Sequence, residues 1–179
     1  MRFAYYDNLS AARQRIYRKS DAIATLGLPP GLALGALVQQ LADALQRDRR
    51  SDVQSVCQRL IDALTAGYHV PRIRVRVLAT RPADGSGELH GLYEPEDEGT
   101  PARVSVWMRT AQRRNVVAFK TFLRTLIHEL CHHLDYELFA LEETFHTEGF
   151  YKRESALASA LLEQKAALAQ DDAHGSGTD

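Results

Sequence analysis

The stretch FKTFLRTLIHELCHHLDY, residues 119–136, determines how the rest of the chain is interpreted. Its apolar residues recur every three to four positions, which predicts a helix from about 115 to 139 with one apolar side. At about 100° per residue, His128, His132 and Asp135 lie opposite that apolar side. We therefore expect a helix that packs on the core along one face and lines a cleft along the other.

The segment His128-Glu129-Leu130-Cys131-His132 has the pattern H-E-x-x-H. Two histidines one helical turn apart can direct both imidazoles at one zinc ion, and the glutamate between them can act as general base on a zinc-activated water. In a chain of this length and composition, chance gives only about 0.02 such matches. Cys131 and His133 fall toward the apolar side, where packing or a hydrogen bond is the expected role.

A catalytic zinc site usually has three protein ligands and keeps its fourth position for water. His146 is one candidate for the third ligand, because the helix is expected to end near Leu141 and the chain can then double back. Glu154, about two turns into the following helix, is the alternative. Asp135 is a candidate for orienting an imidazole from behind. Tyr136, Tyr151 and Arg153 are candidates for stabilising an oxyanion.

The remaining periodicities predict a fold of class α+β. Helices are expected at about 9–26, at 32–47 and from Ser51 onward, the last with a capping box of Ser51 and Gln54. After Gly67 apolar residues alternate, which predicts short strands at 73–77, 88–93 and 103–108 and a small, mainly antiparallel sheet. A closing helix is expected at about 149–169. The predicted parts are a helical region, 1–67, packed on the same core as 68–169, and a disordered tail, 170–179.

Three segments resemble the SprT-like zinc metallopeptidases: His128–His132, Asp135-Tyr136 and His146-Thr147-Glu148-Gly149-Phe150. In that family a H-E-x-x-H helix is followed by a third histidine in the pattern H-x-x-x-F. The resemblance covers about 73–162 and implies a zincin-like single domain that hydrolyses peptide bonds. It also implies His128, His132 and His146 as zinc ligands and Glu129 as general base. Thr147 stands where many members have glycine, and no cysteine-rich zinc ribbon follows.

Composition excludes several other classes of protein. The chain has 179 residues, 45% hydrophobic and 25% charged, as expected for one globular domain. Cys57 and Cys131 are too few for a disulfide framework, which favours a reduced, cytoplasmic protein. The uncharged run 22–42 contains Pro29 and Pro30 near its middle, which argues against a membrane span.

Charge is divided unevenly along the chain. Residues 1–93 contain 13 basic and 8 acidic residues, whereas 94–179 contain 9 and 15. Two groups of arginines are candidates for contact with nucleic acid, which several SprT-like relatives approach because they act on DNA-bound proteins: Arg72, Arg74 and Arg76, and Arg109, Arg113 and Arg114. A solvated basic face is the preferred interpretation, since no DNA-binding module or interleaved aromatic residues accompany them.

Together these patterns predict a zinc-dependent metallopeptidase with a protein or peptide substrate. A substrate strand is expected to add to an exposed edge of the sheet at Arg103–Met108. Two alternatives remain: a non-catalytic zinc-binding or DNA-associated interaction protein, and a peptidase with Glu154 as third ligand. A structural zinc site has no use for Glu129, so its position between the histidines favours catalysis.

Overall fold

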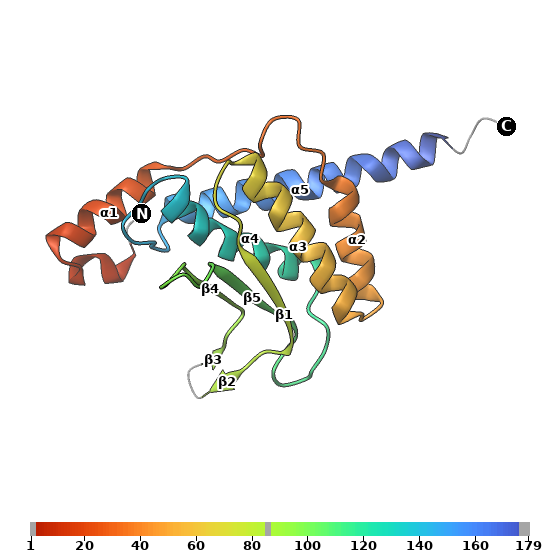
Figure 1. Cartoon of the computed structure of the whole chain (residues 1–179), viewed down its shortest axis with the longest axis horizontal. Coiled ribbons are helices and arrows are strands. Elements are labelled where there is room, and N and C mark those ends of the chain that lie inside the picture. The colour runs from red at the N-terminus through yellow and green to blue at the C-terminus, as the bar shows by residue number, and fades with distance from the viewer. Residues whose placement is uncertain (1–2, 85–86, 176–179) are drawn as a thin grey trace.

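The computed structural model describes residues 3–84 and 87–175, in which helices lie against one side of a small sheet (Figure 1). The first part of the chain is helical, with η1 (Ala4–Asn8), α1 (Ala11–Ala22), α2 (Gly35–Gln46) and α3 (Arg50–Gly67). The strands follow as β1 (Arg74–Thr80), β2 (Ala83–Asp84), β3 (Gly87–Glu88), β4 (Gly91–Glu94) and β5 (Arg103–Arg109). The helices α4 (Phe119–Glu137) and α5 (Glu148–Gly175) complete the chain. The α+β fold class is confirmed.

The boundaries of the helices differ from the predicted ones for identifiable reasons. α4 begins at Phe119 because the residues before it still pair with β5: Val116 forms an antiparallel bridge with Arg109, and Val117 N donates to Met108 O. α5 continues to Gly175, past the predicted end at 169, while 176–179 of the predicted tail lie outside the described residues.

The predicted capping box at the start of α3 does not form. Arg49 occupies the N-cap position without a side-chain hydrogen bond, and Ser51 Oγ bonds the Asp52 carboxylate instead. The Gln54 side chain turns away from the helix and reaches β1. A serine hydroxyl does cap α1, where Ser10 Oγ accepts from Arg13 N.

The main sheet has the strand order β1-β5-β4 and is mixed. β4 is antiparallel to β5, but β1 runs parallel to β5, so the prediction of a mainly antiparallel sheet is wrong for that pair. Parallel pairing is possible here because the long connection from β1 to β5 includes β4 and allows the chain to cross back. β5 is therefore the central strand, and the prediction that Arg103–Met108 offers an exposed edge is also wrong.

The two edges of this sheet differ in whether their outer backbone groups are covered by hydrogen-bonding side chains. On the outer side of β1, Gln54 Nε2 donates to Val75 O at 2.7 Å and Gln54 Oε1 accepts from Val77 N at 2.7 Å. Gln58 repeats the arrangement with Ile73 O and Val75 N, at 3.0 and 2.8 Å. On the outer side of β4, no further strand pairs with it among the described residues. The edge at β1 is closed by amide side chains, and the edge at β4 is open.

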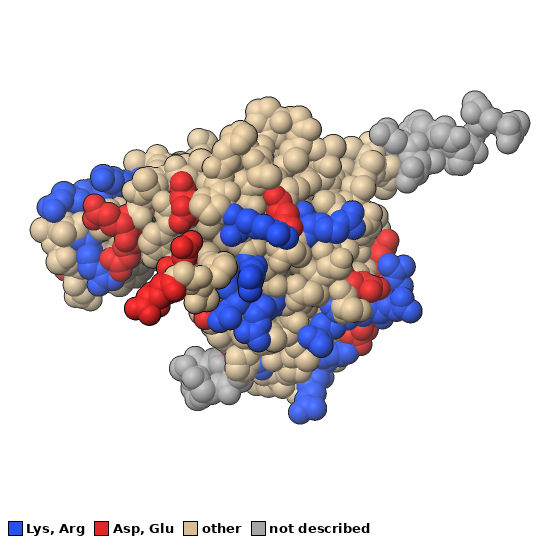
Figure 2. All heavy atoms as spheres, in the orientation of Figure 1, with Lys and Arg blue, Asp and Glu red and all other residues tan. Residues whose placement is uncertain are grey.

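Apolar side chains between the sheet and the helices α3 and α4 form the main core. Val75 and Val77 of β1 point inward, whereas Arg74 and Arg76 alternate to the exposed side. Figure 2 shows this face of the molecule, on which Lys and Arg side chains gather over the sheet below α3. Cys57 and Cys131 are unpaired and buried, as packing residues.

A second apolar cluster joins the N-terminal part of the chain to the connection between α4 and α5. Tyr6, Ile16 and Tyr17 pack against Leu141 and Phe145, which lie in the connection between α4 and α5. The N-terminal residues therefore support the segment that carries His146. None of the helices in the described part of the chain combines the length and apolarity needed to cross a bilayer.

Candidate metal centre

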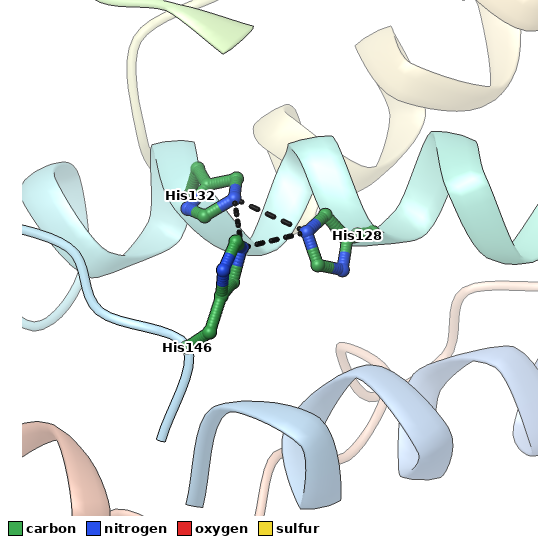
Figure 3. Close-up of side chains that lie close together, drawn as sticks. All are labelled: His128, His132 and His146. Atoms are coloured by element: carbon green, nitrogen blue, oxygen red, sulfur yellow. Dashed lines mark hydrogen bonds between the residues drawn. The ribbon is translucent and has the colours of Figure 1, made fainter. Parts of the chain in front are cut away.

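Three histidine side chains meet at one point above α4 (Figure 3). His128 and His132 lie one turn apart on the helix, and His146 approaches from the connection to α5. The Nε2 atoms are separated by 3.0 Å for His128 and His146, 3.1 Å for His132 and His146, and 3.3 Å for His128 and His132. The structure therefore brings together all three of the predicted histidines, close enough to hold one metal ion.

The triangle of nitrogen atoms has the size that a tetrahedral ion requires. With zinc–nitrogen bonds of about 2.0–2.1 Å, ligand atoms at two corners of a tetrahedron are about 3.3–3.4 Å apart. The three observed separations lie within about 0.4 Å of that range. The chemistry of the donor set, three imidazoles with one open direction, also matches a zinc site that leaves room for water.

The other ring nitrogens of the two helical histidines determine their protonation. His128 Nδ1 donates to Glu154 Oε2 at 2.8 Å. His132 Nδ1 donates to Thr144 Oγ1 at 2.8 Å, and that hydroxyl donates to Asp135 Oδ2 at 2.8 Å. With the proton held at Nδ1, each Nε2 keeps its lone pair for a metal. Burial and the neighbouring histidines lower the pKa of His132 to about 3, so this ring stays neutral.

Glu154 lies behind His128 rather than in the triangle. Its carboxylate bonds the Nδ1 edge of the ring, whereas the three Nε2 atoms meet on the opposite edge. Burial opposes its ionisation, but hydrogen bonds from His128 and Arg124 outweigh that effect and hold its pKa below the usual range. The geometry gives this carboxylate an orienting position, and not the ligand position of the predicted alternative.

Asp135 does not bond a histidine ring directly, in contrast to the prediction, but contacts His132 through the Thr144 hydroxyl. It is completely buried, and besides Thr144 it binds Arg153, whose Nη2 donates to Oδ1 at 2.6 Å. Arg153 also donates to Ser20 O, at the end of α1. A continuous chain of hydrogen bonds thus runs from α1 to the His132 ring. Arg153 is shielded from the cleft by this burial, so it does not reach a substrate oxyanion.

The segment around His146 is fixed from several sides. Tyr5 donates its hydroxyl to His146 O at 3.0 Å. Thr147 Oγ1 accepts from Phe150 N at 3.0 Å and so caps the start of α5. The buried Phe150 ring lies against His132 and His128, with centroid distances of 4.7 and 5.0 Å. The phenylalanine of the H-x-x-x-F pattern is therefore a packing platform for the histidine rings.

Glu129 is buried between the histidines and the sheet. Burial raises its pKa to about 7, opposed by His128 and by the backbone N–H of Tyr93. A Cβ atom added at Gly91 of β4 would overlap the Glu129 side chain, so any larger residue there would displace this carboxylate. A carboxylate with a pKa near neutrality can both accept and return a proton.

A cavity of about 660 Å³ opens over these residues. β4 forms one bank of it and α5 the other, and Tyr136 and Tyr151 line it. Of the three residues predicted as candidates for stabilising an oxyanion, these two tyrosines line the cavity and Arg153 does not. His133 and Cys131 are absent from its lining: His133 Nε2 donates to Pro71 O and its Nδ1 accepts from the Tyr93 hydroxyl.

Two residues of the site were not predicted, Thr144 and Gly91. Each acts through a contact between segments that are distant in the chain, and periodicity carries no signal for such contacts. The scan of protein-family models, the search of curated proteins and the search of solved structures each found no match.

Proposed function

We propose that this chain is a zinc-dependent metallopeptidase with a zincin-like arrangement. One observation carries the proposal: three histidine Nε2 atoms stand at tetrahedral spacing beside a buried glutamate, in a cavity with an open strand edge. His128, His132 and His146 hold the ion. The resemblance to the SprT-like family supports the same assignment.

Each residue has a definable task in peptide hydrolysis. When bound, zinc supplies a Lewis acid that polarises the scissile carbonyl and lowers the pKa of water. Glu129 takes the proton from the attacking water and delivers it to the leaving amine. Tyr136 and Tyr151 line the cavity, and their hydroxyls are the candidate donors to the developing oxyanion. The substrate backbone pairs with β4, which replaces β5 as the edge available for strand addition.

The proposal is tested by separating metal binding from turnover. Glu129→Gln keeps the side-chain volume but removes the base, so we expect about one zinc per chain and a loss of turnover of about 10²–10⁴-fold. Elemental analysis of protein purified without chelator measures the metal, and cleavage of an unfolded protein substrate measures turnover. His146→Ala is the matched variant that loses the metal.

Three results would contradict the proposal or its set of ligands. Undiminished cleavage by the Glu129→Gln protein would show that this residue is not the base. A folded wild-type protein that holds zinc but cleaves nothing would favour the non-catalytic zinc-binding alternative. If Glu154→Ala released the zinc while His146→Ala retained it, the carboxylate would be the third ligand after all.

A second candidate role, contact with nucleic acid, is favoured by an arginine-lined hollow on the opposite side of the sheet. This hollow, about 630 Å³, is lined by Arg72, Arg74, Arg76 and Arg103. Arg74 and Arg103 are register partners on adjacent strands, an unfavourable pairing of like charges that an anion would relieve. Arg72 and Arg103 form ion pairs with Asp62 and Glu94, whereas Arg74 and Arg76 form none among the described residues, although the charge of Arg76 helps to lower the pKa of Glu94.

Removing the two unpaired arginines tests this role. If phosphates bind here, Arg74→Gln/Arg76→Gln weakens binding of labelled duplex DNA and reduces the slope of log affinity against log salt by about 1–2. Arg15→Gln/Lys19→Gln removes the same charge from the exposed side of α1 and serves as control. Equal losses in both variants, or no DNA binding by the wild type, would leave the arginines as a solvated face.

A further inference from the structure

Exposed apolar side chains concentrate around the mouth of the metal cavity. Six large apolar side chains are exposed in the described part of the chain. Three of them line the cavity, two more adjoin it through ring contacts that lead to Tyr151, and Leu168 lines a different hollow. Leu89 and Leu92 line the cavity from the β4 side, 41% and 39% exposed, and Tyr151 lines it from α5. Apolar surface gathered in this way marks a binding site.

The N-terminal residues extend this apolar surface beyond α5. The Phe3 ring meets Tyr151 edge-on at a centroid distance of 5.9 Å, and stacks on Tyr5 at 6.2 Å. Tyr151 in turn stacks on His146 at 5.8 Å. The aromatic rings therefore form one continuous bank that begins at the metal ligand and ends at Phe3.

Two acidic side chains that line the cavity already form ion pairs with neighbouring residues. Glu88 pairs with Arg81, and Glu154 pairs with both Arg124 and His128. Glu129 is buried against Gly91. A ligand that enters the cavity therefore meets apolar side chains and an edge of β4 that no further strand covers in the described part of the chain, and it finds little free charge to recognise.

A strand that adds to β4 would carry its side chains alternately to the two faces of the sheet. Leu92 is exposed on β4, whereas its neighbour Tyr93 turns toward the histidines, 6.3 Å from the His132 ring. Side chains at alternate positions of the added strand would thus lie beside Leu92. Backbone pairing gives such a complex its affinity, and the side chains at alternate positions give it its preference.

We propose that the cavity selects extended, locally unfolded polypeptide segments with large apolar side chains on both sides of the bond over the metal. Folded proteins bury most such side chains and most backbone edges, so only an unfolded or loosened segment offers both. The inference rests on the proposed peptidase function for cleavage, but the preference itself is measurable as binding without turnover.

The test uses the full-length, zinc-loaded Glu129→Gln protein and two labelled peptides of equal length and net charge. One carries Leu and Phe at alternate positions, and the other carries Ser and Gln in their places. Fluorescence anisotropy should show at least about tenfold tighter binding of the apolar peptide. Leu89→Gln/Leu92→Gln should reduce that preference about tenfold. Leu168→Gln makes the same replacement at an equally exposed site on α5 and should leave it unchanged.

The outcomes separate this inference from the proposed function. Equal binding of the two peptides, or an equal loss in the Leu168→Gln control, overturns the apolar preference. Cleavage of both peptides at one rate by the wild type overturns it too, while leaving the peptidase intact. A clear binding preference with no cleavage of either peptide supports the preference and overturns peptide hydrolysis.

Discussion

At the scale of single residues, Gly91 matters because its lack of a side chain leaves space for the Glu129 carboxylate. Its Cα lies against the Glu129 carboxylate, and a methyl group there would overlap Oε1. Because Glu129 is buried, its carboxylate cannot simply swing into solvent to make room. The position of the proposed base therefore depends on the absence of a side chain on the neighbouring strand.

Gly91→Ala should lower turnover without releasing the metal. Displacement of a catalytic group by about 1 Å can cost about 10²-fold, and we expect a loss of that order in kcat. Zinc content, measured on the same preparation, should stay at about one per chain. Gly27→Ala is the matched control, because nothing lies within 4 Å of the added Cβ there. Full activity of the Gly91→Ala protein would show that Glu129 tolerates displacement.

The sequence predicts those site residues whose spacing along one helix places them on the same face. His128, Glu129 and His132 belong to this group, and His146 was proposed as a partner that the structure places beside them. The sequence does not predict the role of Thr144 or the complete burial of Asp135. Asp135 contacts the site only through the Thr144 hydroxyl. Such contacts exist only after α4 and α5 are in place.

At the scale of elements, the side chains of α3 complete the sheet. Gln54 and Gln58 each offer a donor and an acceptor to β1, as a neighbouring strand would. This arrangement explains why a glutamine that looked like part of a capping box lies on the side of α3 facing the strand.

Gln54→Leu should therefore destabilise the fold rather than the start of the helix. It leaves Val75 O and Val77 N without their partner, which costs about 1–3 kcal/mol for each unsatisfied group that stays buried. Urea denaturation monitored by circular dichroism measures the free energy of unfolding. Gln39→Leu removes only a bond to Asp43 within α2, and a change below about 0.5 kcal/mol is expected. Equal stabilities of the two variants would show that water replaces the amide at β1.

Helices were predicted better than the sheet for a physical reason. Apolar spacing reports which face of an element is buried, so it located the helices and the alternation of Arg74, Val75 and Arg76. It does not report which strand lies beside which. The parallel pairing of β1 with β5 joins residues far apart in the chain, and it made β4 the edge instead of β5.

At the scale of the whole molecule, the candidate metal centre is built from segments that lie apart in the sequence. α4 supplies two histidines, and the connection to α5 supplies the third. The N-terminal part of the chain holds that connection through the bond from Tyr5 to His146, and it holds α5 through the bond from Arg153 to Ser20. The sequence predicts that residues 1–67 pack on the same core as 68–169. It does not predict that α1 contacts the connection between α4 and α5.

Zinc should stabilise the whole fold because its ligands lie on two segments. At free zinc about 1,000 times the dissociation constant, binding adds about 4 kcal/mol, or roughly 10 °C in Tm for a chain of this size. Differential scanning fluorimetry with zinc and with chelator measures the shift. His146→Ala removes an exposed ligand and should abolish most of it. An unchanged shift in that variant would place the stabilising zinc elsewhere.

The unequal edges of the sheet also limit how copies of this chain can associate. A sheet with two free edges can polymerise into a ribbon, because every added copy exposes a new edge. Here the glutamines of α3 terminate growth at β1, so edge-to-edge association stops at a pair joined through β4. In that pair each copy would cover the other's histidine-lined cavity, so self-association would compete with ligands for this cavity instead of forming fibres.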